Sequence, residues 1–359
     1  MQTQLRQAVV VAFGRTPYCK ARKGSFAQLH PVEYGAQTLL GVLARVPQLR
    51  PEDIGDVIMG CAMPFGVQGG NMARLIVQRA GLPDCVTAQT VNRYCSSGLQ
   101  TIATAANAIR CGEEDVVIAG GVESMSLVPM LVGAEDADPW LAEHRPEVYT
   151  TMGITAENVA RQWGISRADM DAMAVESHRR AAQAQAGGCF DGQIIPITVP
   201  GPDGGEVVVC RDEGIRPDTT AETLAGLKPC FLENGSVTAA TSSQMTDGAG
   251  FVVLMSEEKA AELGVKPLAR FVSFATGGVP AEVMGVGPIE AVPKALRKAG
   301  LALEQMDTIE LNEAFASQAL AVIRTLGMDP ARVNPWGGAM ALGHPLGATG
   351  AMLTCKALS

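Results

Sequence analysis

The chain has 359 residues, which is long enough for two core-forming units or one large one. Hydrophobic residues make up 47% and charged residues 18%, a composition that excludes a disordered chain. The net charge of −9 disfavours a general nucleic-acid binder. An acidic protein can still hold an anionic ligand through a local basic patch or a helix N-terminus.

The nine cysteines are scattered, and no two form a Cys-x-x-Cys pair, so we expect no metal site. Their odd number and the size of the chain do not favour a disulfide framework, and a reducing cytoplasm is the expected location. Residues 1–6 lack the basic-then-apolar layout of a signal peptide. No apolar run approaches the length of a membrane span, so no membrane partner is expected.

The first 121 residues alternate between strand and helix patterns. Short apolar runs predict buried strands over 8–13, 54–59, 86–91 and 115–119. Helical spacing of apolar residues predicts helices after Pro31, over 73–80 and over 97–109. This alternation predicts an α/β fold with a largely parallel core.

Residues 122–247 differ from what precedes them. They hold acidic loops, a Pro/Trp stretch at 139–146 and predicted helices near 155–163 and 167–187. Strand character returns at 251–255. We therefore predict an N-terminal half made of 1–121 plus 248–267, with 122–247 inserted as a loop domain.

The remaining residues, 268–359, repeat the order of elements in the opening. An apolar run at 269–274 resembles 9–13, and a predicted helix at 288–299 resembles the one after Pro31. Residues 303–312 then align with 51–60. The repetition predicts a duplicated βα unit.

Cys95 stands after a predicted strand and at the N-terminus of a predicted helix. The helix dipole and free N–H groups at that position lower a thiol pKa, which favours a nucleophile. The alternative is a small buried cysteine.

His344 lies in a Gly-rich turn before a helix, the place in the second repeat that Cys95 holds in the first. If the repeats pack about a pseudo-twofold axis, Cys95 and His344 face each other as a Cys/His nucleophile pair. Asn312 follows a predicted strand at 308–311, where an amide can position a water or an enolate oxygen. The alternatives are an exposed histidine in a tight turn and a helix cap.

Several segments together resemble the thiolase family. They are Asn92-Arg-Tyr-Cys-Ser-Ser-Gly-Leu-Gln100, Gly120-Gly-Val-Glu-Ser-Met125, Met152-Gly-Ile-Thr-Ala-Glu-Asn158, Asp247-Gly-Ala-Gly250, Met284-Gly-Val-Gly-Pro288, Asn312-Glu-Ala-Phe315 and Gly343-His-Pro-Leu-Gly347. The Cys-Ser-Ser-Gly sequence is more similar to the degradative 3-ketoacyl-CoA branch than to the biosynthetic branch.

The resemblance implies roles for individual residues. Cys95 would accept the acyl group, His344 would take its proton, and Asn312 would hold a water that completes an oxyanion hole. The positions that correspond to coenzyme A contacts are Met152, Arg216, Phe231, Ala239, Ser243, Met284, Ala314 and Phe315. Arg216 suits a phosphate, with a surface salt bridge as the alternative, and Met152 and Phe231 could equally be core residues.

The resemblance also implies the architecture and partners. It predicts duplicated βαβαβαββ halves in a five-layered α-β-α-β-α arrangement, with 122–247 covering coenzyme A and contributing to a tetramer. Coenzyme A and acyl-CoA would be substrates, with no tightly bound cofactor, and the protein would be a homodimer or homotetramer. The expected reaction is reversible thiolytic cleavage of 3-ketoacyl-CoA.

The family's second catalytic cysteine, in a Cys-x-Gly loop near the C-terminus, has no counterpart here. Cys355 is followed by Lys-Ala-Leu-Ser and falls within the helix after His344. We therefore expect an incomplete, truncated C-terminal half over 268–359, and acyl loading of Cys95 is a safer expectation than full turnover. The alternatives are an acetyl-CoA C-acetyltransferase and an inactive coenzyme A-binding protein; Asn312-Glu-Ala-Phe315 disfavours a decarboxylating ketosynthase.

Overall fold

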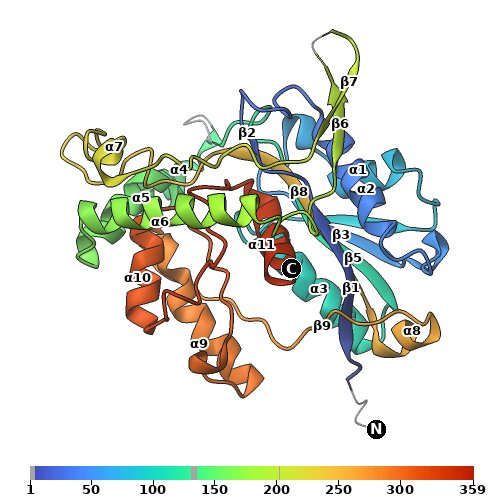
Figure 1. Cartoon of the computed structure of the whole chain (residues 1–359). Helices are drawn as coiled ribbons and strands as arrows, with labels where there is room; N and C mark the ends of the chain where they lie inside the picture. The colour runs from blue at the N-terminus through green and yellow to red at the C-terminus, as the bar shows by residue number, and fades with distance from the viewer. Residues whose placement is uncertain (1–4, 131–135, 202) are drawn as a thin grey trace.

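The computed structural model describes residues 5–130, 136–201 and 203–359 (Figure 1). The signal-peptide expectation over residues 1–6 falls mostly outside the described residues, and so do small parts of the predicted loop domain, at 131–135 and 202. Within the described ranges, no helix has both the length and the apolar character needed to cross a membrane.

The helices and strands follow the predicted order closely. The helices are α1 (Pro31–Leu43), α2 (Met72–Arg79), α3 (Ser97–Cys111), α4 (Pro139–His144), α5 (Met152–Gln162), α6 (Arg167–Ala186), α7 (Ala221–Ala225), α8 (Glu257–Glu262), α9 (Gly287–Ala299), α10 (Ala316–Leu326) and α11 (Thr349–Ala357). The strands are β1 (Ala8–Arg15), β2 (Cys19–Lys20), β3 (Asp56–Gly60), β4 (Thr87–Val91), β5 (Val116–Glu123), β6 (Ile197–Pro200), β7 (Glu206–Val209), β8 (Thr246–Ser256) and β9 (Ala269–Arg270).

One mixed sheet organises the first half. Its strand order is β4-β3-β5-β8-β1-β9, and β2 pairs with β8. Strand β3 runs parallel to β4 and β5, whereas β8 runs antiparallel to β5 and β1. The prediction of a largely parallel core therefore holds only for β4-β3-β5. It is wrong for the rest, because β8 follows a long insertion and returns along β5 in the opposite direction.

Helices cover both faces of this sheet (Figure 1). Val57 and Ile118 point to the face that packs on α1 and α2. Ile58 and Val117, one residue away in each strand, point to the face covered by α3 and α11. Successive side chains of a strand point to opposite faces, so strands buried on both faces read as continuous apolar runs. This arrangement gives three layers, α-β-α, and the predicted α/β fold is confirmed.

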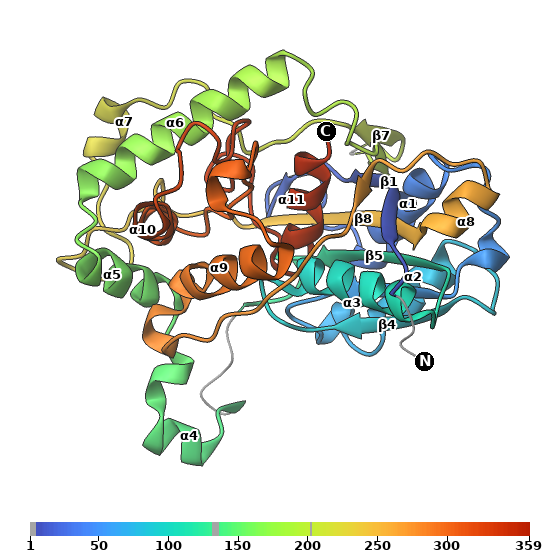
Figure 2. The same cartoon turned by 90° about the horizontal axis from the view of Figure 1, so that it is seen from below.

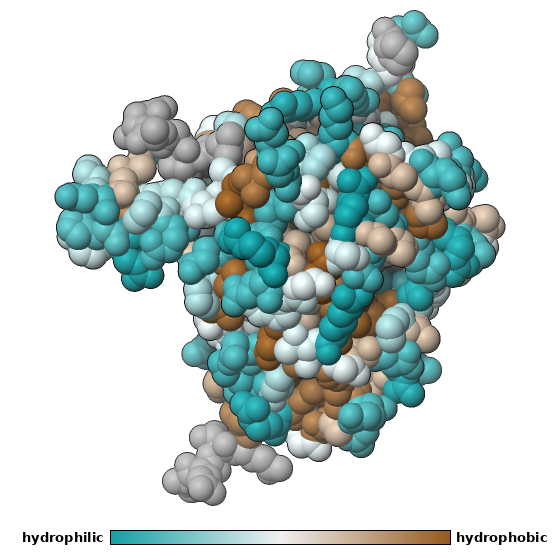
Figure 3. Space-filling model, turned by 90° about the vertical axis from the view of Figure 1, so that its left-hand side faces the viewer, coloured by the Kyte–Doolittle hydropathy of each residue, from teal (hydrophilic) through white to brown (hydrophobic). Residues whose placement is uncertain are grey.

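The second half forms helices but little sheet. In residues 268–359, all of which are described, the predicted strand at 269–274 is reduced to the short β9. The predicted strand at 308–311 is reduced to one bridge between Ile309 and Val333. Helix α9 buries none of its residues. Figure 3 shows the side of the molecule on which α9 and α10 lie, with apolar patches between polar ones.

The insertion between β5 and β8 contains α4 to α7 and a hairpin of β6 and β7. The predicted helices near 155–163 and 167–187 are confirmed as α5 and α6. The β6–β7 hairpin was not expected from the sequence. Figure 2 shows α4 projecting from the body of the molecule. The division of the chain into domains stays a prediction.

Candidate active site

Cys95 lies in the turn between the end of β4 and the start of α3. The Ser97 hydroxyl accepts a hydrogen bond from the Arg93 amide at 2.8 Å and donates to the Tyr94 carbonyl at 2.6 Å, which closes the turn. Tyr94 has a φ of 46°, a left-handed conformation that is costly for a bulky residue. Cys95 is partly exposed and packs against a small apolar cluster containing Ala62, Met63, Met125, Val128 and Leu346.

His344 is buried, with 5% of its surface exposed. Its Nδ1 lies 2.6 Å from the Thr349 hydroxyl, and that hydroxyl donates its proton to the Pro345 carbonyl at 3.0 Å. Because a hydroxyl has only one proton, the Thr349 oxygen accepts from Nδ1–H. This bonding pattern favours the Nδ1–H tautomer, in which Nε2 of His344 carries the lone pair.

Asn312 lies beside the ring of His344. Its side-chain amide nitrogen is 3.3 Å from Nε2 and 3.5 Å from Nδ1. Its carboxamide oxygen is buried and has no hydrogen-bond partner among the described residues. The Asn312 backbone carbonyl accepts a hydrogen bond from Gln318 Nε2 at 3.1 Å, which fixes the residue in place. A buried acceptor without a partner is costly, and it suits a site that binds water or ligand.

The turn that carries His344 lies against glycines of the first half. A Cβ on Gly60, at the end of β3, would come within 2.7 Å of the Gly347 carbonyl, and one on Gly98, in α3, within 2.9 Å. A Cβ on Gly350, in α11, would collide with the backbone of Leu99. The N-termini of α3 and α11 therefore meet backbone to backbone. The structure brings the Cys95 and His344 segments together, as the repeat predicts.

Burial sets the charge state of both groups. Burial raises the pKa of Cys95 to about 12, and the negative charge of Glu123 adds to the effect. Burial lowers the pKa of His344 to about 4. The prediction of a lowered thiol pKa is therefore wrong for the free protein, because desolvation outweighs the backbone hydrogen bond that lowers the pKa. At neutral pH the thiol and the imidazole are both uncharged.

Three of the predicted coenzyme A contacts lie close together. The rings of Phe231 and Phe315 meet edge to face, with centroids 6.0 Å apart. Met152 begins α5, and its neighbour Gly153 packs against the Phe231 ring. Phe231 is 39% exposed, so it is not an ordinary core residue.

Other predicted contacts border the same neighbourhood. The Ser243 amide donates to the Ala314 carbonyl at 2.9 Å, and Ala314 lies between Asn312 and Phe315 in the chain. Ala239 is exposed in the loop before Ser243. Met284 is 40% exposed and lies in a short 3-10 helix, Ala281–Val286, that packs on α5.

Arg216 is exposed, and among the residues that the structure describes its guanidinium has no ion-pair partner. Its backbone amide donates to His178 Nδ1 at 3.1 Å. Burial lowers the pKa of His178 to about 4, and the charge of Arg216 contributes. His178 is therefore a neutral acceptor that holds the backbone of the Arg216 loop.

Cys355 does not belong to the site. It is buried in α11, with its Sγ 3.9 Å from the Phe251 carbonyl on the sheet. Burial raises its pKa to about 12. Its position agrees with the expectation that it does not replace the second cysteine of the family.

Two polar residues near the site were not singled out from the sequence. Thr349 follows His344 by five residues and fixes its tautomer. Glu123 ends the apolar strand β5, within one of the segments that carry the family resemblance. The sequence does hold a signal for Glu123, because an acidic residue at the end of an apolar strand is buried and a buried carboxylate needs specific hydrogen-bond partners.

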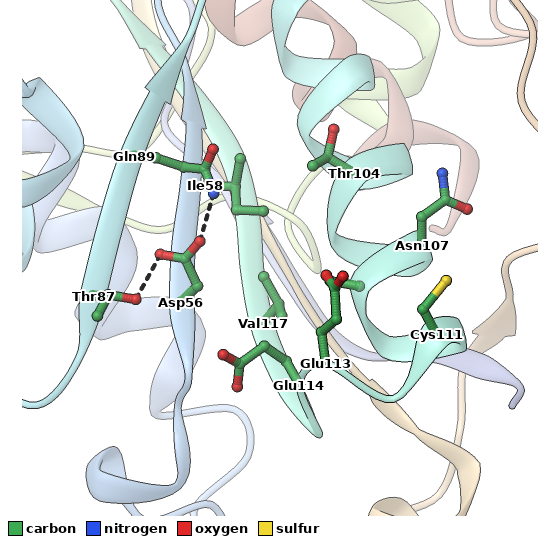
Figure 4. Close-up of a pocket in the computed structure, with 11 residues that line it drawn as sticks. Asp56, Ile58, Thr87, Gln89, Thr104, Asn107, Cys111, Glu113, Glu114 and Val117 are labelled. Carbon is green, nitrogen blue, oxygen red and sulfur yellow. Dashed lines mark hydrogen bonds between the residues drawn. The ribbon is translucent and has the colours of Figure 1, made fainter.

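A separate pocket of about 400 Å³ opens at the far ends of the same strands (Figure 4). Asp56 accepts hydrogen bonds there from Gln89 at 2.7 Å and from Thr87 at 3.0 Å. Glu113 and Glu114 also line it. Ligands of parallel sheets bind at the carboxyl ends of the strands, where Cys95 lies, whereas this acidic pocket is at the amino ends. Its charge does not suit an anionic ligand.

The fold is α/β, and it brings the Cys95 and His344 segments together at the N-termini of α3 and α11. The family model of the thiolase N-terminal domain matches residues 8–258, and that of the thiolase C-terminal domain matches residues 265–359. The chain belongs to the thiolase family.

Relatives and a solved structure agree with this assignment. The chain is 52% identical to the 3-ketoacyl-CoA thiolase of Bacillus subtilis over 358 residues, which cover 98% of this chain and 91% of the relative. It is 44% identical to the peroxisomal 3-ketoacyl-CoA thiolase of Homo sapiens, covering 98% and 83% of the two chains. The crystal structure of the Bacillus anthracis acetyl-CoA acetyltransferase matches with a TM-score of 0.92 at 40% identity, covering 99% of this chain and 92% of that one.

Proposed function

We propose that the protein is a thiolytic acyltransferase that cleaves 3-ketoacyl-CoA with coenzyme A, in fatty acid breakdown, through an acyl thioester on Cys95. Relatives named 3-ketoacyl-CoA thiolase support the reaction. The observation that carries the assignment of residues is the meeting of the Cys95 and His344 segments at two helix N-termini, with the His344 Nε2 lone pair available.

In the first half-reaction the Cys95 sulfur attacks the 3-keto carbon of the substrate while His344 Nε2 takes the thiol proton. Both groups are uncharged in the free protein, so proton transfer accompanies the attack and no free thiolate is needed. The bond between the second and third carbons then breaks, and its electron pair leaves as the enolate of acetyl-CoA. The proton that His344 took from the thiol then goes to the enolate carbon, which completes acetyl-CoA and returns His344 to its neutral form. The shortened acyl group stays on Cys95.

In the second half-reaction the thiol of another coenzyme A attacks the Cys95 thioester. Its proton returns to the cysteine sulfur, and acyl-CoA leaves. Asn312 supports both steps, because its amide nitrogen and unpartnered oxygen can hold a water next to the developing oxyanion. His344 Nε2 receives only the long 3.3 Å contact from Asn312, so it remains able to take a stronger donor.

Coenzyme A would lie along the neighbouring side chains of Met152, Phe231 and Phe315. Residues 122–247 would cover it as a loop domain. Met152 and Phe231 suit the pantetheine arm, since both are apolar and neither is fully buried. The exposed Arg216 suits a phosphate. Coenzyme A and acyl-CoA act as substrates without a tightly bound cofactor, the protein acts as a homodimer or homotetramer, and its location is the cytoplasm.

The test is the mass of the intact protein after incubation with acetyl-CoA. A gain of one acetyl group that is absent in Cys95→Ala supports the acyl-enzyme. Acetylation of another cysteine, such as the exposed Cys85, would overturn the assignment of the nucleophile. Protection of Cys95 from iodoacetamide by acetyl-CoA without acetylation would mean that the chain binds coenzyme A but does not transfer acyl groups.

A second candidate is an acetyl-CoA C-acetyltransferase that forms or cleaves acetoacetyl-CoA. The solved acetyl-CoA acetyltransferase that matches this chain supports it. Rates of thiolysis on acetoacetyl-CoA and on 3-ketooctanoyl-CoA separate the two. A higher kcat/KM on the longer substrate favours the 3-ketoacyl-CoA reaction, and cleavage of acetoacetyl-CoA alone favours the acetyltransferase.

A further inference from the structure

A single buried carboxylate contacts both halves of the candidate active site. Glu123 ends β5, and none of its surface is exposed. Its oxygens accept hydrogen bonds from the amides of Ala62 at 2.7 Å, Met63 at 3.3 Å and Gly347 at 2.7 Å. They also accept one from Gln68 Nε2 at 2.7 Å. These four partners are N–H groups, and the thiol of Cys61, with its Sγ 3.8 Å from Glu123 Oε1, is a fifth and weaker donor.

This donor set selects the ionised form of Glu123. Burial raises the pKa of the carboxyl, and the four hydrogen bonds oppose that effect. A carboxylate has about four lone-pair sites, and the four N–H groups occupy them. A protonated carboxyl or a carboxamide would direct a hydrogen of its own at one of these donors. The geometry therefore requires an acceptor without hydrogens.

The four bonds join segments that lie far apart in the sequence. Ala62 and Met63 belong to the apolar cluster on which Cys95 packs. Gly347 follows His344 by three residues and lies 224 residues from Glu123 in the chain. The Glu123 side chain therefore connects the apolar cluster that contacts Cys95 to the turn that carries His344.

We propose that Glu123 is a positioning residue for acyl transfer, which holds the His344 turn in register with the Cys95 loop. The proposal rests on the function proposed above. Glu123 acts through the backbone of Gly347 and does not touch the reacting atoms. Without the bond to Gly347, His344 Nε2 would lose its alignment with the thiol, and misplacement by about 1 Å can slow a reaction about 100-fold.

The positioning by Glu123 promotes acyl transfer, whereas its charge makes Cys95 a weaker nucleophile. Its negative charge disfavours the thiolate of Cys95. Removing that charge therefore makes the thiol easier to ionise, while removing the positioning makes acyl transfer slower. If Glu123 only tuned the thiol, neutralising it would increase the rate of Cys95 acetylation. If Glu123 only stabilised the fold, its replacement would have no specific effect on Cys95 ionisation or on the acetylation rate of the folded protein.

Two substitutions separate these effects. Glu123→Gln removes the charge and places the NH2 group of the carboxamide against one of the N–H donors. Gly347→Ala keeps the charge, but the new Cβ would lie 2.7 Å from the Ala62 amide and from a Glu123 carboxylate oxygen, so it displaces the turn. The first measurement is the pH profile of Cys95 alkylation by iodoacetamide. The second is the rate of Cys95 acetylation at saturating acetyl-CoA, followed by intact mass.

For Glu123→Gln we expect the alkylation profile to move to lower pH by about one unit, while acetylation slows about 100-fold. For Gly347→Ala we expect an unchanged alkylation profile and a similarly slow acetylation. The matched control is Glu157→Gln. Glu157 is also a buried carboxylate that accepts backbone amides, those of Ser236 at 2.9 Å and Val237 at 2.8 Å, and its loss should leave the Cys95 alkylation profile unchanged.

Acetylation of Glu123→Gln at or above the wild-type rate would overturn the proposal. If Glu123→Gln does not fold, Gly347→Ala still tests it, and wild-type acetylation in that variant would also overturn it. Failure of the wild-type protein to acetylate at Cys95 would instead contradict the proposed function. The two failures are therefore distinguishable.

Discussion

The two ring nitrogens of His344 have different environments, and that difference defines its chemistry. Nδ1 donates to Thr349, whose own proton is committed to Pro345. Nε2 has no partner in Thr349, and its contact is the Asn312 amide nitrogen at 3.3 Å, which is also 3.5 Å from Nδ1. A histidine whose tautomer is fixed in this way needs no rearrangement before it accepts a proton through Nε2.

Thr349→Val tests this arrangement. It replaces the acceptor with a methyl group and leaves Nδ1–H buried without a partner, at a cost of about 1–3 kcal/mol in unfolding free energy. We expect Cys95 acetylation to slow at least about 10-fold, because the other tautomer becomes accessible. Thr349→Ser keeps the hydroxyl and should restore the rate. Acetylation by Thr349→Val at the wild-type rate would contradict the assigned tautomer.

The buried histidines also make stability depend on pH. The pKa of His344 and that of His178 fall from 6.5 to about 4 in the folded protein. Between pH 6.5 and pH 4 the unfolded state binds more protons than the folded state at both residues. The free energy of unfolding therefore decreases as pH falls through this window, on the order of 3 kcal/mol for each residue.

The measurement is urea unfolding at pH 7, 5.5 and 4.5. His344→Asn and His178→Asn should each flatten the decrease, and the double variant should flatten it further. Equal slopes in the wild type and the double variant would show that other groups cause the pH dependence.

At the scale of elements, the site depends on how closely α3 and α11 approach. Gly98 contributes to this contact, because a Cβ there would lie 2.8 Å from the Ala351 amide and 2.9 Å from the Gly347 carbonyl. Backbone atoms cannot move aside as the end of a flexible side chain can. The close approach requires glycine for reasons of space, and the φ angle of Gly98 is not in the left-handed region.

Gly98→Ala should destabilise the protein by about 1–3 kcal/mol and slow Cys95 acetylation, because the helices must separate. Gly226→Ala is the control. Gly226 has open space around its Cβ position and a φ of −78°, so alanine there should be neutral or slightly stabilising. Urea unfolding and intact-mass acetylation of both variants make the comparison. Wild-type behaviour of Gly98→Ala would contradict the inferred packing.

Elements of the first half could be predicted because their patterns are local. The apolar runs and helical spacings give β1, β3, β4, β5 and α1 to α3 to within a few residues. The segment at 308–311 is also predicted as a strand, but it forms only one bridge, between Ile309 and Val333. A strand requires a hydrogen-bonding neighbour, and the sequence of a segment does not say whether that neighbour is present.

At the scale of the whole molecule, a buried ion pair ties the insertion to the sheet. Arg15, at the end of β1, donates to Asp212 at 2.7 and 3.0 Å, and both side chains are fully buried. Arg15 also donates to Gln193 at 2.6 Å. These contacts join residues that are 197 and 178 positions apart in the chain.

Asp212→Ala should decrease the free energy of unfolding by about 3–5 kcal/mol, because it leaves a buried guanidinium unpaired. The double replacement Arg15→Met with Asp212→Leu removes both charges and should recover much of that loss. A double-mutant cycle by urea unfolding measures the coupling. A loss below about 1 kcal/mol for Asp212→Ala would contradict the pairing.

The sequence by itself determined the family, the elements of the first half and the candidate residues Cys95, His344 and Asn312, because these depend on local patterns and on motifs in a fixed order. Only the tertiary structure decided the mixed sheet, the raised thiol pKa, the histidine tautomer and the contacts of Glu123. Desolvation and hydrogen bonding depend on which atoms surround a group. Those atoms come from segments up to 224 residues away, such as Gly347 beside Glu123.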